Sequence, residues 1–357
     1  MRGASALSGT LISSASPFAS SLSTLTGSKE LRGIDSGNVY WAIDATGFYA
    51  SSDGGSTWTT SKGFPPNTTA GANVGKVIHF GTNIYTCAKD EVADRWKIYR
   101  ATRSTDNTVL TWTAVHTMTA GATGTIGVNF NRSPFGAATS YLYLGDYGDP
   151  TGGPSIYRSI DGTTWTTEYT NASIRHIHAV TEDPYNPGHV WSTVGDGNTT
   201  ATILKSTDYG DNWSVAIASF AWQGVQISFS PDWVFVAGDN DRGTLIVIDR
   251  ATSTPYMATP NFHYHHPVPG GAAEARYYRN AFYGIVDPNT GVYYCVANDT
   301  SSDGDTTGLF YVPKVGARVE LLEDISGAGG EMFLVANSLI FGKHRRASTF
   351  RLQMASS

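Results

Sequence analysis

A short motif recurs along the first two thirds of the chain: a Ser, any residue and an Asp, followed within a few residues by a Trp. The four copies are SSDGGSTW (51–58), STDNTVLTW (104–112), SIDGTTW (159–165) and STDYGDNW (206–213). Their starts are separated by about 50 residues, and strand-like segments flank each copy. A repeat of this length with strand-like flanks predicts the blades of a β-propeller.

The four strings resemble the Asp box, S/T-x-D-x-G-x-T-W, which is found in sialidases and in many other propellers. The first string is a full match, and the fourth has Asn212 in place of Thr. The second string is one residue longer and lacks the Gly, and the third is one residue shorter. In that family the box lies away from the active site, so the resemblance implies a fold and not a reaction.

The residues of the motif suit a hairpin turn. The Asp carboxylate accepts backbone N–H groups across the turn, and Gly supplies a positive φ. The Trp begins the next strand and buries ~150–250 Å² between neighbouring blades. We therefore favour a structural role over a carboxylate ligand site for these pairs: Asp53 with Trp58, Asp106 with Trp112, Asp161 with Trp165, and Asp208 with Trp213.

The strand-like segments fall into six groups of four, and the last segment offers only EMFLVA, SLIFGKH and STFRLQMA. The N-terminal stretch SGTLISSAS (8–16) can supply the missing strand, because closing the ring removes two open sheet edges. We predict one all-β domain over residues 1–357, a propeller of seven four-stranded blades. Segment 1–29 supplies the closing strand and 30–357 the blades. Six blades are the alternative if 330–357 forms something else.

Composition excludes several classes of protein. A net charge of −6, with 15% charged residues, argues against nucleic-acid binding, which usually needs a basic face. No apolar run approaches the ~18 residues of a membrane span, and the N-terminus does not read as a signal peptide. Cys87 and Cys295 fall in the second strands of different blades, so we expect two buried free thiols.

Loops between the second and third strands, and between blades, share one face of a propeller; by analogy with propeller enzymes and lectins, that face binds ligands. An acidic residue ends the second strand in six blades: Asp44, Asp90, Asp146, Asp196, Asp239 and Asp299. We favour turn caps for these carboxylates. The alternative is a ring that binds a cation or sugar hydroxyls, which keeps Asp146, Asp196 and Asp239 as ligand-binding candidates.

Arg32, Arg175 and Arg279 each stand at the start of a first strand. Arginine forks suit carboxylates and phosphates, and the resemblance to sialidases implies three arginines around a sialic-acid carboxylate. The family's Arg-Ile-Pro pattern is absent, and only Glu274, Tyr277 and Tyr278 could form a nucleophile pair. We favour arginines that tie blade ends to acidic turns, and we assign no catalytic residue.

Histidines gather in two places. His176 and His178 alternate along one strand, so their rings share one side ~6.5–7 Å apart, with Asp183 downstream. His263, His265 and His266 lie in 261–278, which we expect to be the longest loop between blades. Convergence of an Asp or of these loop histidines would make a metal site. A structural histidine is the favoured interpretation, so we predict no metal and no cofactor.

Aromatic side chains on the same face are candidates for stacking on sugar rings, although each could equally pack between blades. They are Tyr147, Trp222, Tyr264 and Tyr277.

We expect a virion protein of the phage tail or fibre type that recognises host-surface carbohydrate. Its expected partners are that glycan, other virion proteins and further copies of itself, with no nucleic acid and no membrane insertion. An extracellular-looking composition without a signal peptide suits a virion component released by lysis. One alternative is a sialidase-like glycoside hydrolase, which needs a carboxyl pair or a Tyr/Glu pair about 5–10 Å apart. The other is a docking scaffold.

Overall fold

The computed structural model describes nineteen stretches of the chain. They are residues 18–24, 29–34, 38–60, 62–69, 73–103, 110–123, 130–132, 141–196, 200–218, 223–238, 245–257, 262–265, 275–286, 293–299, 306–312, 320–326, 329–335, 338–343 and 349–354. Within these stretches no helix is long and apolar enough to cross a membrane.

Strands dominate the described residues, in which seven antiparallel sheets of three to five strands stand beside one two-stranded ribbon. We name each sheet by its innermost strand. The β2 sheet contains β2 (Glu30–Ile34), β3 (Tyr40–Ile43) and β4 (Phe48–Ser51). The β5 sheet contains β5 (Val74–Phe80), β6 (Asn83–Asp90), β7 (Arg95–Arg103) and β8 (Leu110–Thr117). The β10 sheet contains β10 (Phe130–Arg132), β11 (Leu142–Gly145), β13 (Ser155–Ser159) and β14 (Thr166–Thr170).

The remaining sheets follow in chain order. The β15 sheet contains β15 (Ile177–Glu182), β16 (Val190–Val194), β17 (Thr202–Ser206) and β18 (Ser214–Ala218). The β19 sheet contains β19 (Gly224–Phe229), β20 (Trp233–Gly238), β21 (Leu245–Asp249) and β22 (Thr254–Met257). The β24 sheet contains β23 (Phe262–His265), β24 (Ala275–Val286), β25 (Tyr293–Asp299), β26 (Thr306–Val312) and β27 (Glu320–Ser326). The β28 sheet contains β28 (Gly329–Val335), β29 (Ser338–Lys343), β30 (Thr349–Met354) and β1 (Phe18–Thr24). The ribbon pairs β9 (Ala122–Thr123) with β12 (Tyr147–Gly148).

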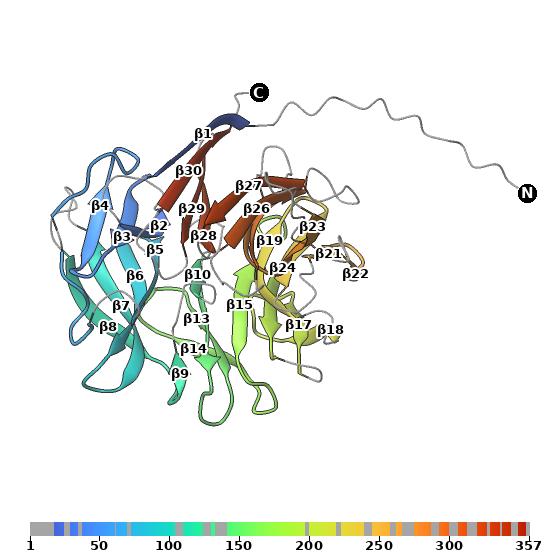
Figure 1. The fold of residues 1–357 in the computed structure, drawn as a ribbon. Helices are drawn as coiled ribbons and strands as arrows, with labels where there is room; N and C mark the ends of the chain where they lie inside the picture. Colours follow the sequence, from blue (N-terminus) through green and yellow to red (C-terminus); the bar gives the residue numbers. More distant parts are fainter. Residues whose placement is uncertain are drawn as a thin grey trace, which may run out of the picture.

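The sheets stand around a common axis (Figure 1). Their innermost strands contact one another in the order β2, β5, β10, β15, β19, β24 and β28, and β28 contacts β2 again. The described strands therefore form a closed ring of antiparallel sheets, which is the predicted all-β class. The number of blades in the whole chain stays a prediction, because several connections between sheets lie outside the described residues.

The N-terminal strand belongs to the last sheet. β1 pairs antiparallel with β30, with Leu22 opposite Leu352 and Thr24 opposite Phe350. It lies within segment 1–29, from which we expected a closing strand, but not at 8–16. Those residues lie outside the described part of the chain.

The core lies between neighbouring sheets. One cluster joins Trp41 and Phe48 of the β2 sheet to Val77 and Ile84 of the β5 sheet, all of them buried. The inner strands approach very closely there, because a Cβ on Gly33 would lie 2.1 Å from the carbonyl oxygen of Val77. Only glycine fits at that point.

Three Ser-x-Asp turns, at 51–57, 159–164 and 206–212, share one hydrogen-bond pattern. The Ser hydroxyl donates to the Asp carboxylate and accepts the N–H of a glycine, which has positive φ in all three turns. The residue before the Trp donates twice to the carboxylate, once from its backbone and once from its side chain. The backbone and side-chain distances are 2.9 and 2.5 Å for Thr57 to Asp53, 2.6 and 2.8 Å for Thr164 to Asp161, and 2.9 and 2.7 Å for Asn212 to Asp208. The Asn212 amide thus does the work of a Thr hydroxyl. Asp106 lies outside the described residues.

Each of the four tryptophans is partly buried, and three of them pack on the preceding sheet. Trp112 contacts Phe48 at 5.1 Å between ring centroids, and Trp165 contacts His116 at 5.5 Å. Trp213 lies 6.3 Å from Tyr169, whereas Trp58 packs against the cluster around Leu31 in its own β2 sheet. Trp112, Trp165 and Trp213 therefore join neighbouring sheets.

The pKa of Asp208 predicts a pH-dependent stability. Hydrogen bonds from the Asn212 side chain, the Ser206 hydroxyl and the Asn212 N–H lower this pKa to about 2. A lowered pKa in the folded state adds stability above the unfolded value of about 3.9, and this contribution is lost as the pH falls toward 2. The melting temperatures of wild type and Asp208→Asn should therefore differ at pH 6 and converge below pH 4. Asn212→Thr, which keeps both donors, should behave as wild type. A difference in melting temperature between wild type and Asp208→Asn that stays constant with pH would contradict this account.

Polar contacts also join neighbouring sheets at this end of the ring. Arg158 of the β10 sheet donates to the Tyr209 carbonyl at 2.7 Å and to Asp211 at 2.7 Å, both in the turn of the β15 sheet. The turn after β21 has no Ser-x-Asp motif, and there Arg250 reaches back to Asp183 at 2.8 Å. Both of these side chains are buried.

Cys87 is buried and free, as expected. Burial raises the pKa of its thiol. The side chain of Cys295 lies outside the described residues.

Candidate functional site

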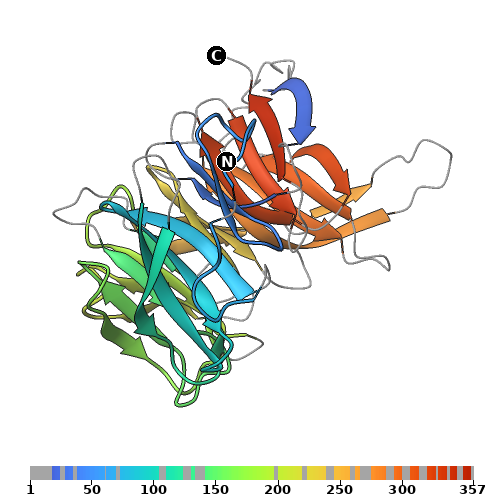
Figure 2. The ribbon, with the colours of Figure 1, turned by 90° about the vertical axis from the view of Figure 1, so that its left-hand side faces the viewer.

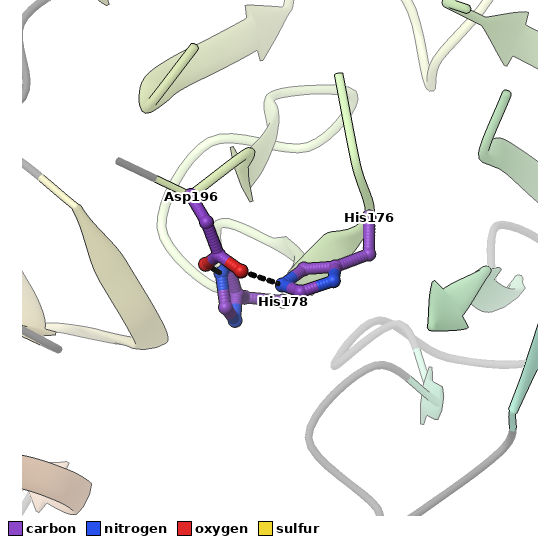
Figure 3. A group of neighbouring side chains, drawn as sticks. All are labelled: His176, His178 and Asp196. Carbon is purple, nitrogen blue, oxygen red and sulfur yellow. Dashed lines mark hydrogen bonds and ion pairs between the residues drawn. The ribbon is translucent and has the colours of Figure 1, made fainter. Parts of the chain in front are cut away.

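A cluster of charged and imidazole side chains gathers at the end of the ring opposite the Ser-x-Asp turns. β15 runs from His176 toward the turn end, β16 returns from there, and Asp196 follows it. His176 and His178 therefore meet Asp196 at one end of the β15 sheet (Figure 3), and Arg175 also reaches this carboxylate. The β10 sheet on one side contributes Asp149, and the β19 sheet on the other contributes Gln223. Three neighbouring sheets build the cluster.

Asp196 is the centre of the cluster. Its Oδ1 lies 2.9 Å from His178 Nε2 and accepts the Gln223 side-chain amide at 3.1 Å. Its Oδ2 lies 2.9 Å from His176 Nε2 and accepts Arg175 Nη1 at 3.2 Å. Burial acts to raise the pKa of Asp196, but hydrogen bonds and charge from His176 and His178 outweigh it and hold the pKa well below its usual range. Asp196 is therefore an anion throughout the neutral range.

The two histidines are almost fully buried. The Nδ1 atom of His176 lies 3.3 Å from the carbonyl oxygen of Gly148. Its ring stacks on Tyr147, at 4.2 Å between centroids and an interplanar angle of 25°, and meets the His178 ring edge-on at 4.5 Å. Tyr147 and Gly148 form β12, so the β9–β12 ribbon fixes the orientation of the imidazole.

Arg175 is the solvent-facing part of the cluster, with 57% of its side chain exposed. Its Nε donates to Asp149 Oδ1 at 2.9 Å while its Nη1 reaches Asp196. The bond to Asp149 and the nearby carboxylate charges raise the pKa of Arg175. An exposed guanidinium is thus held between two carboxylates, Asp196, which is partly buried, and Asp149, which is open to water.

Two of the other Asp residues that end second strands cap turns, as favoured. Asp44 accepts the N–H of Thr46 at 2.7 Å and pairs with Lys29. Asp90 accepts the N–H of Ala93 at 3.0 Å and pairs with Lys97 at 2.7 Å.

Asp146 has a third environment. It is fully buried, and its Oδ2 accepts Thr119, Tyr157 and the N–H of Ser155. Burial raises the pKa of Asp146 despite these bonds. Among the described residues, only Asp196 of this set contacts the histidines, and Asp239 and the side chain of Asp299 lie outside them.

Among the described residues, the candidate arginines are held by acidic side chains near each of them. Arg32 is buried and pairs with Glu30 of its own strand at 3.1 Å, whereas Arg175 pairs with Asp149 and Asp196. The side chain of Arg279 lies outside the described part. The favoured interpretation, arginines that tie blade ends to acidic turns, describes Arg175, whereas Arg32 pairs within its own strand.

The structure corrects the expectation that residues 261–278 form a long loop between blades. His263 and Tyr264 lie in β23, which pairs with the first four residues of β24, and Tyr277 is opposite His263. This hairpin extends beyond the rest of its sheet, on the right-hand side of Figure 2. Alternating aromatic and histidine residues suit strands, which explains the difference. The side chains of Tyr277 and the hairpin histidines, and all of Trp222, lie outside the described residues.

Sequence reasoning missed two members of the cluster and misplaced one candidate. Asp149 and Gln223 were not selected, although Asp149 is two residues after Tyr147 and Gln223 directly follows Trp222, which were both considered. Asp183, considered as a partner of the histidines, lies at the opposite end of β15 and pairs with Arg250. Strand direction separates them, since Asp183 follows the far end of the strand.

Comparisons with known proteins bear on the fold. No family model and no curated protein matches the chain. Among solved structures, the GH74 xyloglucanase from Xanthomonas campestris superposes with a TM-score of 0.61 and 14% identity, over 90% of this chain and 52% of that one. The RRP9 WD40 repeats give a TM-score of 0.59 and 11% identity, over 95% and 99%. The chain is a β-propeller.

A third match is YCF48 bound to D1 peptide, with a TM-score of 0.56 and 11% identity over 94% of this chain and 97% of that one. This β-propeller spans about half the length of the xyloglucanase. At these identities the likeness shows the fold alone, so the function must be argued from the site.

Proposed function

We propose that this propeller is a receptor-binding protein of a virion, and that the end of the ring carrying Arg175 recognises host-surface carbohydrate. The observation that carries the proposal is the exposed Arg175 guanidinium held between Asp149 and Asp196. Guanidinium and carboxylate groups together offer donors and acceptors for sugar hydroxyls, and Arg also suits an acidic sugar. His176, His178 and Gln223 fix Asp196 from the buried side, so the polar groups are positioned before a ligand arrives.

The same geometry favours binding over hydrolysis. A glycoside hydrolase needs a carboxylic acid that keeps its proton near neutral pH. Asp196 is held as an anion, and Asp146, whose pKa is raised by burial, is inaccessible to a sugar. The hydrolase is therefore the second candidate, favoured by the fold shared with a xyloglucanase. A pure docking scaffold is the third.

The virion assignment rests on sequence. We propose that the Ser-x-Asp turns are Asp boxes, which occur in propellers of phage tail and fibre proteins. Their shared hydrogen-bond pattern supports this. The low share of charged residues, 15% of the chain, suits a protein that works outside the cell. The proposed partners are a host glycan, other virion proteins and further copies of the chain, with no nucleic acid and no membrane insertion.

A glycan array followed by titration of the best ligand tests this function. Arg175→Ala should weaken binding by about 10-fold to 100-fold, because a charged hydrogen bond of 1.5–3 kcal/mol is lost. The matched control is Arg95→Ala, which removes an arginine at the same end of the ring from the β5 sheet and should bind as wild type. Equal affinity in wild type and Arg175→Ala would overturn the site assignment. Release of reducing sugar by wild type, lost in Arg175→Ala, would establish the hydrolase instead.

A further inference from the structure

Each ring nitrogen of His176 faces an oxygen that can only accept a hydrogen bond. Nδ1 lies 3.3 Å from the Gly148 carbonyl oxygen, and Nε2 lies 2.9 Å from Asp196 Oδ2. A neutral ring carries one hydrogen, so it can donate to only one of the two oxygens. A hydrogen on Nδ1, toward Gly148, leaves a lone pair on the buried Nε2 that faces the carboxylate. A lone pair facing a carboxylate oxygen is repulsive unless a positive charge lies between them.

The three side chains resemble a metal-ligand set in chemistry and spacing. Two imidazole nitrogens and a carboxylate are typical ligands of Zn²⁺ and related divalent ions, with an open position left for water. The ligand atoms of His176, His178 and Asp196 lie within 4.8 Å of one another. Metal–ligand bonds of about 2.0–2.2 Å place such atoms about 3.4 Å apart, so small side-chain movements suffice. A carbonyl that fixes the other ring nitrogen is the usual support of a ligating histidine.

We propose that His176, His178 and Asp196 bind a divalent transition-metal ion, with Zn²⁺ the best fit. The ion would lie between His176 Nε2, His178 Nε2 and the Asp196 carboxylate. This inference does not depend on carbohydrate binding.

The surrounding charges allow a divalent ion. Asp149 and Asp196 carry two negative charges against one positive charge on Arg175. Arg175 is largely exposed and already bonded to Asp149, so it can leave Asp196 when the ion binds. Gln223 continues to orient Asp196 through Oδ1.

Titration of EDTA-stripped wild-type protein with ZnCl₂ is the first test. Calorimetry and metal analysis after dialysis should show one zinc per chain at micromolar affinity or tighter, and Co²⁺ should give visible d–d absorption. His176→Gln and Asp196→Asn should each weaken zinc binding about 100-fold or more. The control His189→Gln alters another histidine of the same sheet and should bind zinc as wild type.

Two outcomes of the titration overturn the proposal. In one, wild type binds no zinc at micromolar concentrations. In the other, His176→Gln and Asp196→Asn both bind zinc like wild type, which places the metal at other histidines. If the variants fail to fold, ¹⁵N NMR of the wild-type imidazoles tests the site directly. Zinc should shift the resonance of His176 Nε2. A ring protonated on both nitrogens and insensitive to zinc would identify an imidazolium and overturn the proposal. A glycan array without hits changes none of these results.

Discussion

Replacing Trp191 by Ala is expected to lower the free energy of unfolding by about 3–5 kcal/mol. Trp191 is fully buried in β16, and its cluster contains Ile203 of its own sheet and Ile227 and Val236 of the β19 sheet. The Lys205 ammonium lies 4.6 Å from the ring centroid. The substitution removes a large apolar surface and leaves a cavity between two sheets.

Urea unfolding followed by circular dichroism measures this loss. Trp233→Ala is the matched control, because Trp233 is only partly buried at the start of β20. Its replacement should lower the free energy of unfolding by clearly less. A loss below about 1 kcal/mol for Trp191→Ala would mean that neighbouring sheets do not depend on this packing.

Replacing Asp183 by Ala is expected to cost a similar amount, about 3–5 kcal/mol. The change leaves the Arg250 guanidinium buried without its carboxylate, because Asp183 is wholly inaccessible and Arg250 nearly so. It also removes the acceptor of the Tyr185 N–H and of the Asn186 amide. This ion pair joins the β15 and β19 sheets where the Ser-x-Asp motif is missing.

A double variant distinguishes the cost of the unpaired buried charge from the cost of the lost hydrogen bonds and contacts. Asp183→Ala with Arg250→Met should be more stable than Asp183→Ala alone, since no unpaired charge remains buried. Chemical denaturation of wild type, Asp183→Ala, Arg250→Met and the double variant gives the four free energies of unfolding for this comparison. A double variant no more stable than Asp183→Ala would show that the hydrogen bonds, and not the charge, set the cost.

The repeated part of the fold could be predicted because the motif has a local physical cause. An Asp carboxylate, a positive-φ glycine and a Trp act within one turn, so their spacing in sequence implies their geometry. Asn212 could replace Thr without loss of the pattern because it also donates from its side chain. The β23–β24 hairpin was missed because glycine and proline near 267–271 suggested a loop, whereas the flanking aromatic residues form strands.

The candidate site was harder to predict, because it depends on which blades are neighbours. His176 and His178 could be selected from their alternation, and Asp196 from its place after a strand. Their convergence required the register of β15 on β16, in which Ile177 is opposite Val194. Asp149 and Gln223 come from the two flanking sheets, and no local pattern connects them to the histidines. Of the three candidate arginines, Arg175 belongs to the cluster, whereas Arg32 pairs with Glu30 of its own strand, and the side chain of Arg279 lies outside the described residues.

A crystal structure with the strongest oligosaccharide from the array tests the central claim most directly. We predict sugar density in contact with Arg175 and Asp149, at the end of the ring opposite the Ser-x-Asp turns. Sugar bound only at the turn end, or a saturated crystal with no sugar at Arg175, would contradict it.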